Sequence, residues 1–118
     1  MRDHTKLRAF GLADELVLAV YKETCGFPRE EMFGLTSQLR RAAISTASNI
    51  VEGCARSSEA EYIHFLDMAY ASAREAEYQI SLASRLGFLP EETHKDLANR
   101  SAETCKVLNG LLRALGNQ

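Results

Sequence analysis

The sequence has no long apolar run, and it holds only two prolines and three cysteines among its 118 residues. No stretch approaches the roughly 20 consecutive apolar residues of a membrane-spanning helix, so we expect no membrane segment. The cysteines, Cys25, Cys54 and Cys105, are widely spaced, with no Cys-x-x-Cys pair and no cluster with histidine. That usage is typical of reduced thiols in a cytoplasmic protein, so we expect a cytoplasmic location and no metal centre.

A basic excess is also missing. The formal net charge is −2 and the pI is about 5.9, whereas a general nucleic-acid-binding domain is usually basic. The sequence contains neither a Gly-x-x-x-x-Gly-Lys-[Ser/Thr] loop nor a Gly-x-Gly-x-x-Gly turn, the two patterns that cradle phosphates. No nucleophile is paired locally with a base. We therefore expect no enzyme, no catalytic residue, no cofactor and no small-molecule substrate, although a local basic patch stays compatible with this charge.

The chain does contain strong helical periodicity. Breaks around Pro28 and Pro90, and a third at Ser57 and Ser58, divide it into segments of about 7–24, 35–54, 59–86 and 92–115. The two serines are good N-cap candidates for the third segment. Short loops between long helices favour an all-α, antiparallel up-down-up-down four-helix bundle. The length favours one domain over residues 1–118.

Each segment predicts an apolar stripe at a spacing of three and four residues. The expected core is Phe10, Ala13, Leu16, Val17, Val20 and Tyr21; Leu35, Leu39, Ala43, Ala47, Ile50 and Cys54; Tyr62, Phe65, Leu66, Ala69, Ala73, Ala76, Ile80 and Ala83; and Leu97, Ser101, Thr104, Leu108, Leu111 and Leu115. Six apolar residues of the third segment lie off its stripe: Ile63, Met68, Tyr70, Tyr78, Leu82 and Leu86. One bundle core cannot cover them all, so we expect either scattered surface residues or self-association.

Helical bundles can hold a di-iron site built from Glu-x-x-His pairs, and two such pairs occur, Glu61–His64 and Glu91–His94. Each pair opens a helix, and in antiparallel neighbours those two helix starts lie at opposite ends of the bundle. The two pairs therefore cannot share a metal site. We expect their acids to lie on the surface, near the positive ends of helix dipoles.

Arg40 and Arg41 stand side by side in the second segment. At 100° per residue, Arg40 falls at the edge of the apolar arc, where a carboxylate partner is needed. Folding this segment back on the next one brings residue 40 near Glu75 and Glu77. We therefore predict a structural ion pair from Arg40 to Glu75 or Glu77, within or between protomers. Arg41 points outward, and solvent, a neighbouring subunit and an external ligand all remain open for it.

Charge also differs between the two ends of the predicted bundle. At the end with the loop 55–58, five bases stand against four acids, a balance of +1, while four bases stand against six acids at the other end, a balance of −2. A ring of like-oriented subunits would multiply this bias into a basic rim able to hold phosphates, whereas a monomer would show an ordinary mixed surface. The candidate nucleic-acid-binding residues are Lys6, Arg8, Arg41 and Arg56.

The stretch GLTSQLRRAAISTASNIVEG (34–53), followed by ARSS, EYIHFLDMAYAS and EAEYQISLASRLGFL, resembles the 23S rRNA intervening-sequence protein family, also called the four-helix-bundle protein family. The resemblance covers about residues 12–115. Its signature positions here are Gln38, Arg40, Arg41, Asn49, Glu52 and Gly53. The chain departs from the family pattern at Thr46-Ala47, where Ile-Pro is usual, and at Ala55, where a glycine is usual.

This resemblance implies a bacterial four-helix protomer that assembles into a cyclic homopentamer and has no catalytic residues. The accessory variability determinant of diversity-generating retroelements is more distantly similar, and it binds nucleic acid and engages a reverse transcriptase. We therefore expect a non-enzymatic oligomeric scaffold that binds copies of itself and either structured RNA or a nucleic-acid enzyme. The alternative is a protein–protein interaction scaffold with no nucleic-acid role.

Overall fold

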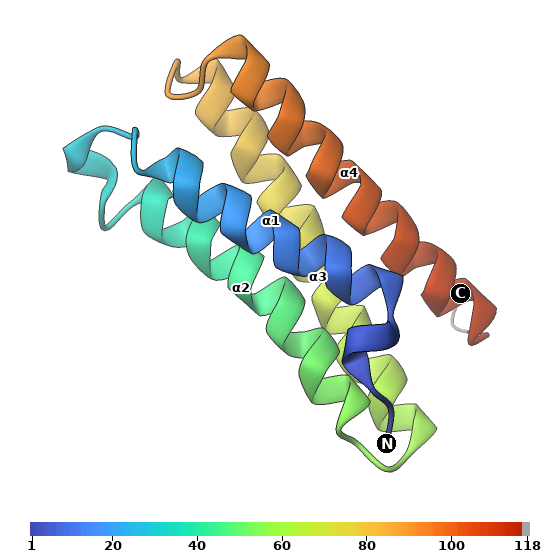
Figure 1. Ribbon diagram of the computed structural model, residues 1–118. Coiled ribbons are helices and arrows are strands. Elements are labelled where there is room, and N and C mark those ends of the chain that lie inside the picture. Colours follow the sequence, from blue (N-terminus) through green and yellow to red (C-terminus); the bar gives the residue numbers. More distant parts are fainter. Residues whose placement is uncertain (117–118) are drawn as a thin grey trace.

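The computed structural model describes residues 1–116, and within them the secondary structure is entirely helical. Four helices, α1 (Arg8–Thr24), α2 (Leu35–Cys54), α3 (Glu59–Arg85) and α4 (Glu91–Ala114), form a rod with extents of 43 × 22 × 22 Å (Figure 1). Two short 3-10 turns, η1 (His4–Lys6) and η2 (Arg29–Glu31), were not predicted. The four predicted helical segments agree with these bounds to within one residue at each end.

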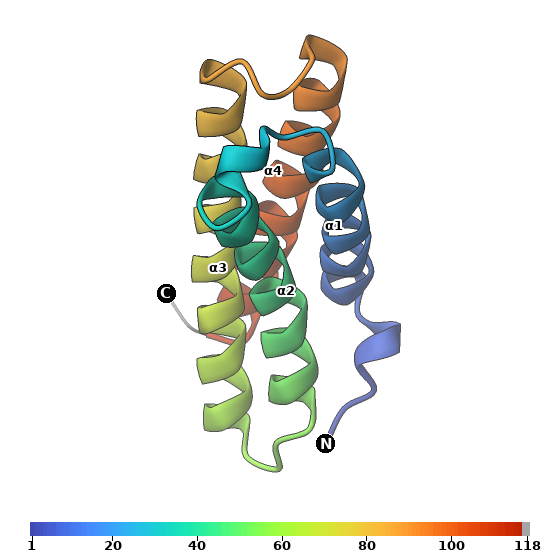
Figure 2. The ribbon, with the colours of Figure 1, turned by 90° about the vertical axis from the view of Figure 1, so that its left-hand side faces the viewer.

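Each helix packs against two others: α1 against α2 and α4, and α3 against α2 and α4. The four helices thus enclose one core along the rod, consistent with a four-helix bundle. The N-terminal segment lies beside the loop between α2 and α3 at one end of the rod (Figure 2), and the backbone N–H of Arg2 donates to the Cys54 carbonyl at 2.7 Å. This contact ties the N-terminus to the end of α2.

Local sequence signals explain where α3 begins and ends. Ser58 accepts a hydrogen bond from the Glu61 N–H at 3.1 Å, which makes it the N-cap, and two acids occupy the first turn. At the other end Gly87 has a φ of 81°, and the N–H groups of Gly87 and Phe88 donate to the carbonyls of Ser84 and Ala83. This is a Schellman motif, which favours glycine because its φ is positive.

The core divides into two apolar clusters. Leu16, Leu39, Ile80 and Leu97 belong to one cluster, and Ile50, Tyr62, Leu66 and Leu108 belong to the other. Three buried polar residues fall between these clusters in sequence: Thr46, Ser101 and Thr104. Each hydroxyl donates to a carbonyl of its own helix at 2.8 to 3.1 Å, so burial leaves none of these donors unsatisfied.

Several expected core residues lie further out than their stripes predicted. Tyr21 is exposed, Phe10, Ala47 and Phe65 are only partly buried, and Leu112 is buried in place of Leu111 and Leu115. The α4 stripe was read with a heptad spacing, and a straight helix drifts about 20° per heptad from that repeat. The core contact therefore moves to Leu112 by the last turn of α4.

Candidate functional site

Arg40 is held by α1 within the protomer. Its Nε donates to the Thr24 hydroxyl at 2.8 Å, one Nη donates to the Tyr21 carbonyl at 3.4 Å, and the guanidinium lies 4.6 Å from the Tyr21 ring centroid. The predicted ion pair to Glu75 or Glu77 is therefore wrong within the chain. The spacing of 100° per residue placed Arg40 correctly at the edge of the apolar face of α2. That edge faces α1, whereas Glu75 and Glu77 lie on α3.

Arg41 is exposed, as predicted, and lines a hollow of about 540 Å³ on the α2 surface. The other lining residues are Phe33, Ser37, Gln38, Ala42, Ser45 and Glu75. Glu75, expected beside Arg40, thus shares a hollow with Arg41 instead, and it also accepts a 3.5 Å hydrogen bond from Gln79. Ion pairs among residues 1–116 involve five other arginines and not Arg41.

Several signature residues form one polar stripe along α2. Gln38, Arg41, Asn49 and Glu52 are separated by three, eight and three positions, which keeps them on one side of a helix. Ser45 continues this stripe: Ser72 of α3 donates to its hydroxyl at 3.0 Å, and the Asn49 amide donates to its carbonyl at 2.9 Å. The stripe therefore runs along the contact between α2 and α3.

Gly53 has a packing role at the end of the same helix. A Cβ on Gly53 would lie 3.0 Å from the Phe65 Cβ and 3.2 Å from the Tyr62 carbonyl oxygen. Only a residue without a side chain lets α2 and α3 approach this closely. Glycine at this signature position is thus explained by helix packing.

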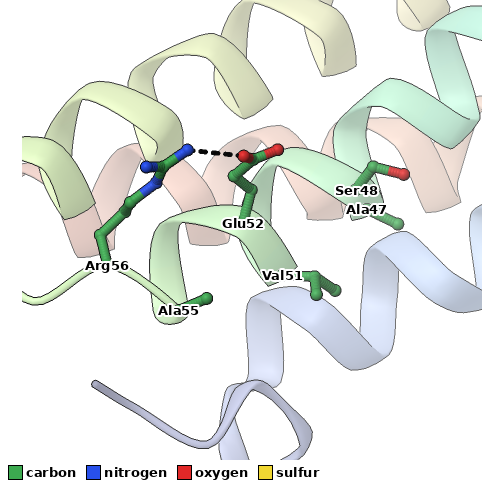
Figure 3. A pocket seen from close by; sticks show the side chains of 6 residues that line it. All are labelled: Ala47, Ser48, Val51, Glu52, Ala55 and Arg56. Atoms are coloured by element: carbon green, nitrogen blue, oxygen red, sulfur yellow. Dashed lines mark hydrogen bonds and ion pairs between the residues drawn. The ribbon is translucent and has the colours of Figure 1, made fainter.

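A second hollow, of about 470 Å³, lies on the C-terminal half of α2 (Figure 3). Its lining residues are Ala47, Ser48, Val51, Glu52, Ala55 and Arg56. Glu52 and Arg56 point toward each other and pair at 2.7 Å, while Val51 and Ala55 project away from that pair. The Arg56 guanidinium also lies 4.8 Å from the Phe65 ring centroid. The hollow therefore has an apolar floor of small side chains and a charged rim.

Lys6 and Arg8 line a third hollow, of about 400 Å³, together with Glu15. Arg8 also pairs with Glu103 of α4 at 2.6 Å. The four candidate nucleic-acid-binding residues thus line three separate hollows, and one protomer does not bring them into a single site. Arg2 lies at the end of the rod that holds the loop 55–58, and it pairs with Glu59 at 3.3 Å. Of the five bases counted at that end, Arg2, Arg8 and Arg56 are thus paired with carboxylates.

Phe33 is the feature that the pattern analysis missed. It is 93% exposed, more than any other large hydrophobic residue among residues 1–116, and Met32 beside it is 55% exposed. The signal was available, since Phe33 lies between a helix-breaking segment and α2 and belongs to no apolar stripe. The loop that carries it is held by hydrogen bonds: Glu31 accepts from the Leu35 N–H at 2.9 Å and the Glu31 carbonyl accepts from the Gly34 N–H at 2.9 Å.

All three cysteines are free thiols; Cys25 is exposed, whereas Cys54 and Cys105 are buried. Burial raises the pKa of Cys54, and burial together with nearby Glu77 raises the pKa of Cys105 to about 11. Both buried thiols are therefore protonated at neutral pH and are weak nucleophiles.

Residues 1–116 contain no group of three or more metal-ligating side chains, and Glu61 and Glu91 are exposed acids in the first turns of α3 and α4.

The model of the 23S rRNA-intervening sequence protein family matches residues 5–110. The chain belongs to this family. A crystal structure of an S23 ribosomal protein family member from Bacteroides thetaiotaomicron is similar, with a TM-score of 0.79 and 25% identity over 88% of this chain and 97% of that one. That protein is described as having unknown function. A comparison with curated proteins returns no match.

Membership in the 23S rRNA-intervening sequence protein family confirms the resemblance read from the GLTSQLRRA stretch. The structure separates that family signature into two groups. Arg40 and Gly53 hold α2 against α1 and α3, whereas Arg41 and Gln38 line an open hollow. A search for a ligand site in this family member should therefore start from the second group. None of the helices in residues 1–116 combines the length and the hydropathy of a membrane-spanning segment.

Proposed function

We propose that this protein is a non-enzymatic, oligomeric helical scaffold that binds structured RNA or a nucleoprotein. Arg41 carries the proposal: it is exposed, takes part in no ion pair among residues 1–116, and shares its hollow with Ser37, Gln38 and Ser45. Glu75, which accepts from Gln79, is the one acid among the described residues that line this hollow. An arginine surrounded by hydroxyl and amide groups suits phosphate and base edges. Lys6 at the basic end also takes part in no ion pair among these residues, and adds positive charge for phosphates.

The proposed protomer is an antiparallel up-down-up-down bundle, and the proposed assembly is a cyclic homopentamer. Cross-helix contacts support the antiparallel order, because Ser45 meets Ser72 while the later Gly53 meets the earlier Phe65. Exposed apolar residues of α3 and of its C-cap support assembly: Met68, Tyr78 and the C-cap Leu86 are 40%, 59% and 52% exposed. In contrast, Ile63, Tyr70 and Leu82 pack partly against the core.

The non-enzymatic character and the cytoplasmic location belong to the same proposal. The protonated state of the buried thiols supports the first, since neither Cys54 nor Cys105 offers an activated nucleophile. The free state of all three cysteines supports the second.

Titration of a labelled structured RNA at two salt concentrations tests the RNA proposal. We expect saturable binding that weakens as salt rises, with a smaller salt dependence for Arg41→Ala than for the wild type. Lys95→Ala is the charge-matched control, because Lys95 is exposed on α4 and lines no part of the Arg41 hollow. No saturable, salt-sensitive binding at physiological salt would rule the proposal out.

A protein-interaction scaffold without a nucleic-acid role is the second candidate. The exposed Phe33 and Met32 favour it, since aromatic and methionine side chains are enriched at protein interfaces. Capture of a partner that survives nuclease treatment, by a protein that shows no RNA binding in the titration, would favour this candidate over the first.

A further inference from the structure

Phe33 and the apolar hollow on α2 (Ala47, Val51 and Ala55, with Ser48, Glu52 and Arg56 at its rim) have complementary chemistry. The phenyl ring is 93% exposed on a loop, where it contributes nothing to its own core. The hollow has a volume of about 470 Å³ and is open to solvent along one helix, and an enclosed apolar cavity of roughly 150 Å³ already accommodates benzene. The hollow can therefore accept an aromatic side chain.

The two features cannot meet within one copy of the chain. Phe33 precedes the first turn of α2, and the hollow lies on the last turns of that same helix (Figure 3). Residues 35 and 51 are about 24 Å apart along a helix with a rise of about 1.5 Å per residue. The Phe33 that fills the hollow must therefore come from another molecule.

We propose that Phe33 of one copy inserts into the Ala47–Val51–Ala55 hollow of the next copy, in a head-to-tail contact. The proposal rests on the self-assembly proposed above and assigns the residues of its interface. Contacts of this kind join two different patches, so successive copies form a ring when the rotation closes.

Charge and rigidity both favour a second copy as the occupant. Arg41 lies in the hollow beside Phe33, and Glu52 lies at the rim of the receiving hollow with its side chain 52% exposed. Glu52 already pairs with Arg56 through one carboxylate oxygen, and its other oxygen can still accept. Insertion thus brings Arg41, which takes part in no ion pair among residues 1–116, toward an acid that can hold a second base. Hydrogen bonds from Leu35 and Gly34 to Glu31 hold the Phe33 loop in place, which limits the conformational entropy lost on association.

Two variants separate the halves of the contact. Phe33→Ala removes the inserting ring, and Ser48→Trp fills the hollow from an exposed position. In sedimentation or light scattering, each variant should weaken self-association by on the order of 30-fold or more. Leu18→Ala, which truncates a side chain that is 66% exposed on α1, is the control and should assemble like the wild type.

Mixing the two variants gives the sharpest result. The Ser48→Trp copy keeps Phe33 and the Phe33→Ala copy keeps the hollow, so a mixture should form a 1:1 dimer that neither variant forms alone. A contact of Phe33 with Phe33 would give no such rescue, and that result would overturn the head-to-tail arrangement. Melting curves of both variants establish that each is folded before mixing.

A cross-link keeps the proposal testable if a variant folds poorly. Phe33→Cys with Val51→Cys, in a Cys25→Ser background, should give disulfide-linked multimers that neither single cysteine gives. If the wild type is oligomeric but the multimers and the variant effects are missing, this interface is wrong and the proposed assembly stands. If the wild type is a monomer at micromolar concentration, both this interface and the proposed assembly are wrong, and Phe33 is left available to a different protein.

Discussion

Arg40 and Arg41 are adjacent in sequence but lie in different environments. Arg40 is partly buried and its guanidinium contacts the last turn of α1, where it bonds the Thr24 hydroxyl and faces the Tyr21 ring. Arg41 is exposed and lines an open hollow beside Gln38 and Glu75. A rotation of about 100° per residue separates the two side chains, so one stabilises the bundle while the other faces whatever lies outside it.

The same contrast recurs for other residue types that occur both inside and outside the bundle. Gly53 is packed against α3, whereas Gly110 on α4 has open space around it. Cys105 is buried, whereas Cys25 is exposed. Within each pair the residue type is the same and only the surroundings differ. The outer residue therefore serves as the control when the inner one is substituted.

The glycine pair should show the largest difference in stability. Gly53→Ala would place a Cβ 3.0 Å from the Phe65 Cβ and 3.2 Å from a backbone oxygen, and neither neighbour is a flexible side-chain end. We expect a loss of about 1–2 kcal/mol of unfolding free energy, since overpacking exceeds the gain in helix propensity. Gly110→Ala should instead stabilise by about 0.5–1 kcal/mol. Urea unfolding of both variants measures the difference, and equal midpoints would show that α2 and α3 are not in close contact at Gly53.

The arginine pair should show the next largest difference. Arg40→Ala should cost about 1–2 kcal/mol, because it removes a hydrogen bond to Thr24 and a cation–π contact with Tyr21. Arg41→Ala should change the free energy of unfolding by less than about 0.5 kcal/mol. Arg40→Lys keeps the charge but not the planar guanidinium, and should resemble Arg40→Ala. Thermal melts test this, and a single melting temperature for the two alanine variants would show that both arginines face solvent.

The sequence predicted the helices well because their signals are local. Pro28, Pro90 and the Ser58 cap mark helix ends, and apolar spacing marks the inner faces. It did not predict which helix receives Arg40, since periodicity gives an angle around α2 and not the identity of the neighbour on that side. Phe33 was missed for a related reason: its place outside every apolar stripe can be read from the sequence, but a loop residue breaks no helical pattern, and its 93% exposure follows only from the fold.

The cysteine pair should differ in reactivity and in its effect at high pH. Burial raises the pKa of Cys105 from its ordinary value of 9.0 to about 11. Above pH 9 the thiol therefore ionises in the unfolded chain before it ionises in the folded one, so the folded state loses stability as the pH rises from 9 to about 11. A pKa that rises from 9.0 to about 11 corresponds to about 3 kcal/mol without solvent screening, and screening by nearby water reduces the expected loss of unfolding free energy to about 1 kcal/mol across that window. Cys105→Ala should reduce this slope. Thiol labelling of the native protein should modify Cys25 alone. Rapid labelling of two or more thiols in the folded state would contradict the burial of Cys54 and Cys105.

The smallest expected difference lies between two outward-facing bases of one hollow, Lys6 and Arg8. Arg8 pairs with Glu103 at 2.6 Å, but the two side chains are 65% and 41% exposed, so water and salt screen the attraction. Arg8→Ala should lower the free energy of unfolding by less than about 0.5 kcal/mol at low salt, and Lys6→Ala should have no measurable effect. The gap should disappear in high salt. If either variant weakens RNA binding by far more than it changes stability, its charge acts on the ligand, because the ion pair with Glu103 contributes too little to the fold to explain the loss.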